Sequence, residues 1–232
     1  MKEHYRQIYT DHAPDYQRLV AREDHHGALL PAIVAVHPLR DATVVELGAG
    51  TGRLTRLLAP QARSIAAFDA SAAMLAVAQR ENVARGITNV TLAVAEHHAL
   101  PVDDDSADLV AEGWAFGHLM DQANWRTAVD AALGEVDRIT RPGGVQLLIE
   151  TLGTGRTDPA PPSPALTTLF VYLETQGFIR SWCRTDYRFD SPAEAEELVG
   201  FFFGAGMVDA VQPGPPTTLA ECTGLWARTK AR

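Results

Sequence analysis

Cysteine is scarce in this sequence of 232 residues, which contains only Cys183 and Cys222. Two cysteines are too few for a disulfide framework or for a zinc site built on thiolates. We therefore interpret both as reduced thiols that pack as small apolar groups. Stability must then come from an ordinary core, which a chain of this length with 46% hydrophobic residues can supply.

Long hydrophobic runs are also missing. The apolar stretches have the length of strands, and none approaches the roughly 20 residues that a membrane-spanning helix needs. The first residues, Met1 to Gln7, are polar and charged, whereas a secretory signal has an apolar core at this place. We therefore expect a cytoplasmic protein that does not associate with membranes.

Basic residues are outnumbered by acidic ones, with 20 lysines and arginines against 29 aspartates and glutamates and a formal net charge of -9. Nucleic-acid-binding proteins usually carry a basic patch, because contacts to phosphate supply much of their affinity. The acidic balance argues against DNA, RNA or an anionic membrane as the main partner. We expect a small-molecule partner and a chain that is a monomer or a homodimer.

Segments typical of strands and helices alternate through the middle of the chain. Short apolar runs predict strands over 43–45, 64–68, 90–95, 107–111 and 145–150. Apolar residues at helical spacing predict helices over 52–59, 71–85 and 124–140. This alternation is typical of an α/β fold with a doubly wound, mostly parallel sheet and helices on both faces.

The N-terminal residues depart from this alternation. Aromatic and apolar residues from Tyr5 to Leu19 recur at three- and four-residue steps, with an interruption at Pro14, and a further helix is predicted over 27–36. We interpret residues 1–40 as an N-terminal helical cap and residues 41–232 as one globular domain.

The C-terminal residues depart from it as well. Phe178 to Phe189 is expected to be extended, and 219–228 is predicted to be the last strand. Between them, Ser191 and Pro192 have the residue types that begin a helix, and Glu194 completes a capping box. This late unit is expected to add an antiparallel pair to one edge of the sheet.

A glycine-rich turn, Glu46 to Gly52, lies between the first predicted strand and its helix. Gly48 and Gly50 have no side chains, so the backbone can turn sharply and approach a ligand closely. A dinucleotide site would need the pattern G-x-G-x-x-G. Here the third glycine, Gly52, comes one residue early and Arg53 occupies the dinucleotide position. A nicotinamide-dependent oxidoreductase is therefore disfavoured.

The string Val44 to Gly52 resembles motif I of the class I, Rossmann-like methyltransferases that use S-adenosylmethionine. The resemblance implies seven strands in the order 3-2-1-4-5-7-6 with the last strand antiparallel. It also implies that Glu46 orders the glycine loop and meets the amino end of the methionine moiety. The loop residues Gly48, Ala49, Gly50 and Gly52 would then lie beside the bound S-adenosylmethionine.

Further motifs of that family follow in order. By resemblance, Asp69 accepts the ribose hydroxyls and Met74 packs on the adenine, although Asp69 alone would equally suit a nicotinamide enzyme or a helix cap. Glu96 accepts from the adenine amino group, while His97 acts through its backbone N–H. Ala70 and Glu112 complete the residues assigned to cofactor binding. Arg141 to Gly144 is predicted to be a turn before the fifth strand, and Asp103 to Asp105 a solvated loop.

The methyl acceptor is expected beyond the carboxyl ends of the strands. His118 is the predicted general base, because histidine titrates near working pH, and His25 and His26 are alternatives. Tyr9, Tyr16 and Trp114 are the predicted substrate-binding residues, and Thr151 to Pro164 is a candidate lid. No metal is required for this chemistry.

The resemblance thus implies a methyltransferase that acts on a small molecule. A non-catalytic subunit or regulator that binds S-adenosylmethionine is the alternative. The sequence does not distinguish an oxygen, nitrogen, carbon or sulfur acceptor.

Overall fold

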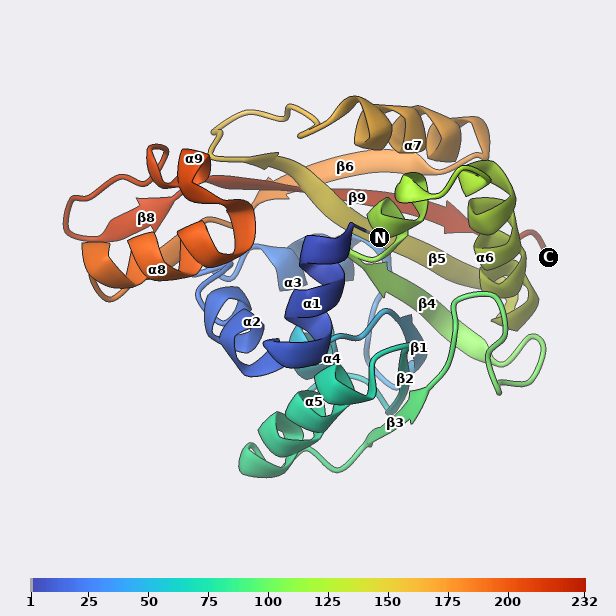
Figure 1. Cartoon of the computed structure of the whole chain (residues 1–232). Helices are drawn as coiled ribbons and strands as arrows, with labels where there is room; N and C mark the ends of the chain where they lie inside the picture. The colour runs from blue at the N-terminus through green and yellow to red at the C-terminus, as the bar shows by residue number, and fades with distance from the viewer. Residues whose placement is uncertain (1) are drawn as a thin grey trace.

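A computed structural model describes residues 2–232 and shows a single large sheet with helices packed on both faces (Figure 1). The sheet has seven strands in the order β3-β2-β1-β4-β5-β9-β6. Their bounds are β1 Thr43–Leu47, β2 Ser64–Asp69, β3 Val90–Val94, β4 Ala107–Gly113, β5 Thr140–Thr154, β6 Ile179–Arg184 and β9 Glu221–Thr229. Strands β1 to β5 pair in parallel, and β9 is antiparallel to both β5 and β6. The predicted fold class and strand order are confirmed, with β9 as the last strand.

The helices are α1 Glu3–Asp11, α2 Ala13–Val20, α3 Leu29–Val36, α4 Arg53–Leu58, α5 Ala72–Ala84, α6 Trp125–Ile139, α7 Pro164–Thr175, α8 Pro192–Phe203 and α9 Ala205–Val208. A 3-10 helix, η1, spans Phe116–Asp121. Two short strands, β7 Tyr187–Phe189 and β8 Thr217–Leu219, form a separate pair beside α8 at one end of the molecule (Figure 1). Within residues 2–232, every helix is too short or too polar to span a bilayer.

The alternating side chains of the central strands divide the core into two layers. In β4, Leu109 and Ala111 pack with α3 and α4, whereas Val110 faces the cluster that contains α6 and α7. Successive residues of a strand point to opposite faces, so one buried strand serves both layers. Helix α3, which we assigned to the cap from the sequence, contributes Leu29 and Ile33 to the first of these layers.

The N-terminal helices α1 and α2 lie between α5 on one side and α8 on the other. Ala13 at the start of α2 packs against Met74 and Val77 of α5. On its other side, α2 meets α8 through an ion pair between Arg18 and Glu197, with Nη1 and Oε1 2.6 Å apart. Helices α1 and α2 of the cap therefore lie over the sheet edge at which β1 and β2 end, as Figure 1 shows.

Two local predictions differ from the structure. Arg141 to Gly144 is not a turn: it lies inside β5, in a bulge between the pairs Ala107–Thr140 and Leu109–Val145. Gly144 also pairs with the C-terminal residues, because the Lys230 amide donates to its carbonyl oxygen. The candidate lid is also shorter than predicted, since Thr151–Thr154 belongs to β5 and α7 begins at Pro164.

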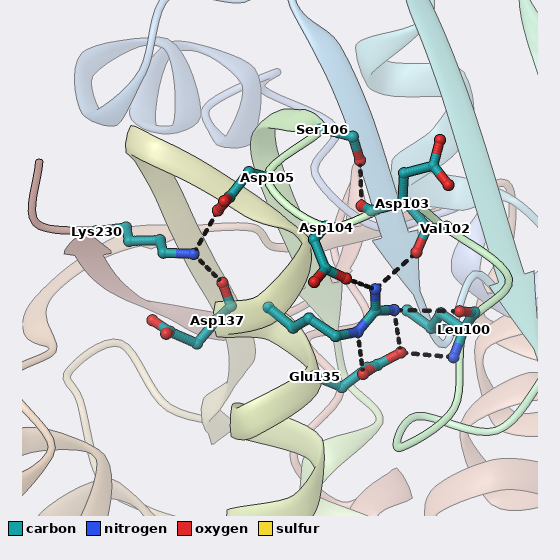
Figure 2. Close-up of polar contacts among 10 residues, drawn as sticks. Leu100, Val102, Asp103, Asp104, Asp105, Ser106, Glu135, Asp137 and Lys230 are labelled. Atoms are coloured by element: carbon teal, nitrogen blue, oxygen red, sulfur yellow. Dashed lines mark hydrogen bonds and ion pairs between the residues drawn. The ribbon is translucent and has the colours of Figure 1, made fainter.

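The acidic run Asp103 to Asp105 is anchored rather than simply solvated (Figure 2). The Asp104 carboxylate lies 2.5 Å from Nη1 of Arg138, and the Asp105 carboxylate lies 2.7 Å from Nζ of Lys230. Arg138 also donates to the carbonyl oxygens of Val102 and Leu100. These contacts fasten the loop before β4 to α6 and to the C-terminus, so the acids hold the loop in place.

The largest fully buried side chain is Trp226 in β9. Its ring stacks on Phe170 of α7 with centroids 4.2 Å apart. Two residues earlier on the same face, Gly224 leaves the space that the indole fills, because a Cβ there would lie 2.5 Å from ring atoms of Trp226.

We expect Trp226→Ala to lower the free energy of unfolding by ~3–5 kcal/mol, because it removes a large buried ring and leaves a cavity. Trp182→Ala on neighbouring β6 is the control, since Trp182 is 46% exposed and should cost less than ~1 kcal/mol. Denaturant unfolding of both variants measures the difference. Equal losses would contradict the role given to Trp226.

Candidate functional site

The glycine turn leaves β1 at Leu47 and enters α4 at Arg53. Gly48, Gly50 and Gly52 have φ angles of +65°, +55° and +82°, which residues with a side chain rarely adopt. A Cβ on Gly48 would lie 2.4 Å from Cβ of Ala115. The turn is therefore bare backbone, in close approach to the loop that follows β4.

Asp69 fastens this turn to the next strand and helix. It is the last residue of β2, and its carboxylate accepts from the Gly50 amide at 2.8 Å and from the Ser71 amide at 2.7 Å. Burial raises the pKa of Asp69, while these two hydrogen bonds oppose that rise. Each carboxylate oxygen can accept a second hydrogen bond, so the carboxylate retains acceptor capacity for a ligand hydroxyl.

Glu46 is buried beneath the turn. Only 1% of it is exposed, and Oε2 accepts from the Thr55 hydroxyl of α4 at 2.6 Å. Burial raises the pKa of Glu46 to about 8. The side chain links β1 to the helix that follows the turn, which suits the predicted ordering of the loop. Its predicted contact with the methionine moiety stays a prediction.

The other residues assigned to the cofactor surround the same turn. The Met74 methyl carbon lies 3.3 Å, and His97 Cε1 lies 3.4 Å, from the Cβ positions built on Gly50 and Gly48 respectively. The Ala49 amide donates to the Phe68 carbonyl oxygen, Ala70 directly follows β2, and Glu96 is exposed beyond the end of β3. Glu112 is buried and accepts from the Ala115 amide at 2.6 Å and from the Phe116 amide at 3.0 Å. The structure brings these residues together, and their individual roles stay predictions.

A cavity of about 740 Å³ lies next to the turn. It is enclosed by α1 and α2, the loop after β4, the end of β5, the loop before α7, and residues near α8. Tyr9, Tyr16, Trp114 and His118 from the sequence prediction all line it. His25 and His26 do not line it. Their rings lie against each other at a tilt of 41°, and the His25 amide donates to the Asp186 carbonyl oxygen.

His118 is held inside this cavity wall. Its Nε2 lies 3.1 Å from the Tyr9 hydroxyl, which joins the loop after β4 to helix α1. Burial lowers the pKa of His118 to about 4, so the imidazole is neutral at pH 7. A base of such low pKa holds a proton weakly, which makes His118 a poor general base.

The ionisable residues of the cavity wall that were not predicted from the sequence include Glu23, Arg53, Glu150 and Glu221. Arg53 forms an ion pair with Glu23 and lies 3.4 Å from the ring centroid of Trp114. Glu150 accepts from the Gly117 amide at 2.7 Å, and Glu221 accepts from the Thr151 hydroxyl at 2.6 Å. The sequence holds a signal for Glu150, because a carboxylate at the end of the apolar run Val145 to Glu150 is rarely there for packing alone.

Residues 44–144 match the family described as a methyltransferase domain. This segment contains the glycine turn, Asp69 and Glu96 in the order that the resemblance implies. Over residues 44–144 the chain is therefore similar to S-adenosylmethionine-dependent methyltransferases. The cofactor of this family is S-adenosylmethionine, and the turn between β1 and α4 has the bare backbone that such a ligand requires.

The chain is similar to proteins of known sequence over its central part. An uncharacterized methyltransferase of Schizosaccharomyces pombe is 38% identical over 47% of this chain and 38% of its own length. The malonyl-[acyl-carrier protein] O-methyltransferase of Pectobacterium atrosepticum is 31% identical over 60% of this chain and 49% of its own length. The chain thus spans less than half the length of these curated relatives.

A solved structure supports the fold over the whole chain. Phosphoethanolamine N-methyltransferase 2 of Haemonchus contortus, crystallised with S-adenosyl-L-methionine, matches with a TM-score of 0.65 and 16% identity. The match covers 100% of this chain and 61% of that one. At this identity, the likeness concerns the fold alone.

The raised pKa of Glu46 predicts a pH-dependent stability. The folded state retains a proton that the unfolded state releases, so stability is lost as pH rises from about 5 to about 8. In this pH range, Glu46 contributes up to ~1.4 kcal/mol per pH unit to the slope of the unfolding free energy against pH. We expect Glu46→Gln to lack this contribution. Unfolding free energies of wild type and variant across this range provide the measurement. The exposed Glu196→Gln should leave the slope unchanged, and a Glu46→Gln slope equal to wild type would refute the assignment.

Proposed function

We propose that the chain transfers a methyl group from S-adenosylmethionine to a small molecule bound in the cavity. The observation that carries this proposal is the contact between the turn and the cavity wall. Gly48 meets Ala115, and Ala115 lies between Trp114 and Gly117, which both line the cavity. A methyl donor on the turn would therefore face an acceptor in the cavity.

The residues of the turn are suited to this donor. Gly48 and Gly50 offer backbone at positions that a side chain would block, and Asp69 offers oxygen acceptors beside them. When bound, S-adenosylmethionine supplies a sulfonium that is already an activated methyl donor. The protein then contributes mainly by holding the acceptor in line with the donor, and positioning can supply ~7–11 kcal/mol of a barrier.

The acceptor is proposed to be small because the cavity volume of about 740 Å³ falls in the range of small-molecule sites. The formal net charge of -9 supports a partner other than a nucleic acid. The similar proteins named above methylate oxygen in one case and nitrogen in another, so they leave the acceptor atom open. A cytoplasmic location and a monomeric or homodimeric state remain predictions.

Binding of S-adenosylhomocysteine to wild type, Gly48→Ala and Gly86→Ala tests the donor site. Gly86 has the same φ of +65° as Gly48, but a Cβ there meets nothing within 4 Å. Both variants should lose ~1–2 kcal/mol of stability from the backbone conformation. Gly48→Ala should lose more, because its Cβ would also meet Cβ of Ala115. Only Gly48→Ala should lose affinity for S-adenosylhomocysteine in calorimetry. Wild-type binding of NADH without S-adenosylhomocysteine binding would refute the proposal.

We propose that His118 positions Tyr9 rather than acting as the general base. Tyr9→Phe and His118→Gln should then each lower kcat about tenfold, and the double variant should fall no further, because both changes remove one interaction. If His118 were the general base, His118→Gln would instead lower kcat ~10²–10⁴-fold. Tyr9→Phe would then lower kcat much less than His118→Gln. The rate is followed as S-adenosylhomocysteine release with an acceptor found by screening. The exposed His98→Gln is the control.

A further inference from the structure

Within residues 2–232, the buried part of the cavity wall carries more acid than base. The side chains of Glu23, Glu150 and Glu221 line the cavity, with Glu23 only 3% exposed in its side chain and the other two 3% and 2% exposed overall. Arg53 is the guanidinium that shares this wall, and its ion pair with Glu23 satisfies one of the three acids. Among residues 2–232, Glu150 and Glu221 form no ion pair within 4 Å, and the charge of Arg53 reaches Glu221 only from a longer distance.

Glu221 has an unused acceptor. Its Oε1 accepts from the Thr151 hydroxyl, whereas its Oε2 is buried with no hydrogen-bond partner among the described residues. A buried polar atom without a partner is costly, and a carboxylate oxygen especially so. A ligand that brings an N–H donor into the cavity would remove this cost.

Glu150 is held at the boundary between the cavity and the donor site. Its Oε1 accepts from the Gly117 amide, in the loop that also meets the glycine turn. A Cβ on Gly117 would come within 3.3 Å of both carboxylate oxygens, so the glycine allows this close approach. Glu150 is therefore anchored to the loop that lies between the cavity and the glycine turn.

Aromatic rings cover much of the remaining wall: Tyr5, Tyr9, Tyr16, Tyr187, Phe202 and Phe203. The faces of aromatic rings attract cations, and the attraction strengthens when the site is shielded from water. Carboxylates and aromatic faces in one cavity are the surroundings that an alkylammonium group prefers. At the mouth, by contrast, Lys2, Asp121 and Arg156 are exposed and carry both signs of charge.

We propose that the methyl acceptor is an amine on an apolar body, bound with its nitrogen between Glu150 and Glu221. This inference rests on the proposed function and names its substrate class. The apolar body would pack against the aromatic wall and Leu166, while the nitrogen donates to the carboxylates.

The reaction balances without a further reactant. The bound ammonium first gives one proton to the Glu150 carboxylate, which leaves a neutral amine with a free lone pair. The nitrogen then forms a bond to the methyl carbon, and the carbon–sulfur bond breaks with its electron pair passing to sulfur. The products are S-adenosylhomocysteine and a protonated methylamine, and Glu150 returns its proton to solvent. Burial raises the pKa of the Glu150 carboxyl, which makes it a stronger base than an exposed carboxylate.

The test uses matched probes on the protein saturated with S-adenosylhomocysteine. Benzyl, 2-phenylethyl and hexyl bodies are each supplied as the amine, the alcohol and the carboxylate homologue, and their affinities are measured by calorimetry. We expect at least one amine to bind about tenfold more tightly than its alcohol, and the carboxylates to bind least. Failure of every amine to bind, or equal affinity of amine and alcohol, would overturn the proposal.

Two variants assign the selectivity to the carboxyl groups. Glu150→Gln and Glu221→Gln should each reduce the affinity for the preferred amine about tenfold and leave that for its alcohol within about twofold. The exposed Glu196→Gln removes the same charge outside the cavity and should change neither. Equal losses for amine and alcohol would overturn the assignment.

Affinity for S-adenosylhomocysteine is measured on the same samples. If the wild-type protein does not bind S-adenosylhomocysteine, the proposed function itself is refuted. If the wild-type protein binds S-adenosylhomocysteine but does not prefer amines over alcohols, only the proposed substrate class is refuted.

Discussion

The hydrogen bond from the Gly50 amide to the Asp69 carboxylate is the contact on which the site depends. It joins the turn after β1 to the end of β2, and the neighbouring Ala49 amide makes a second link to the Phe68 carbonyl oxygen. Because β1 and β2 are parallel and adjacent, both strands end at the same edge of the sheet. The left-handed backbone of the turn is thus held open toward that edge, where the cap lies.

The cavity next to this turn is assembled from distant parts of the chain. Helix α1 supplies Tyr9, η1 supplies His118, β5 supplies Glu150 and β9 supplies Glu221. Burial of carboxyl groups is unfavourable, so their retention needs specific partners. The Gly117 amide serves Glu150, and the Thr151 hydroxyl serves Glu221. The cavity wall is therefore preorganised before any ligand binds. The free-energy cost of burying its carboxyl groups would be offset by a ligand of opposite charge.

Local patterns in the sequence were sufficient for the frame and for the glycine turn, but not for the acidic residues of the cavity wall. The apolar runs of β1 to β5 and the glycine turn are short contiguous signals, which explains their agreement with the structure. Helix α7 was missed although Ser163 and Pro164 give the same start signal as Ser191 and Pro192, and Ser163 does cap it. Arg141 to Gly144 was assigned wrongly, because proline and glycine mark a bulge as readily as a turn.

The meeting of Glu150 and Glu221 in one wall was beyond the reach of such patterns, because it depends on β9 entering between β5 and β6. That insertion pairs Thr154 with Glu221 and brings a C-terminal acid to the end of β5. Glu23, Glu150 and Glu221 also all lie outside residues 44–144, the segment that matches the methyltransferase family. Similarity to known proteins therefore supports the methyl donor. The proposal for the acceptor rests instead on the segments before and after this stretch and on the geometry of this chain.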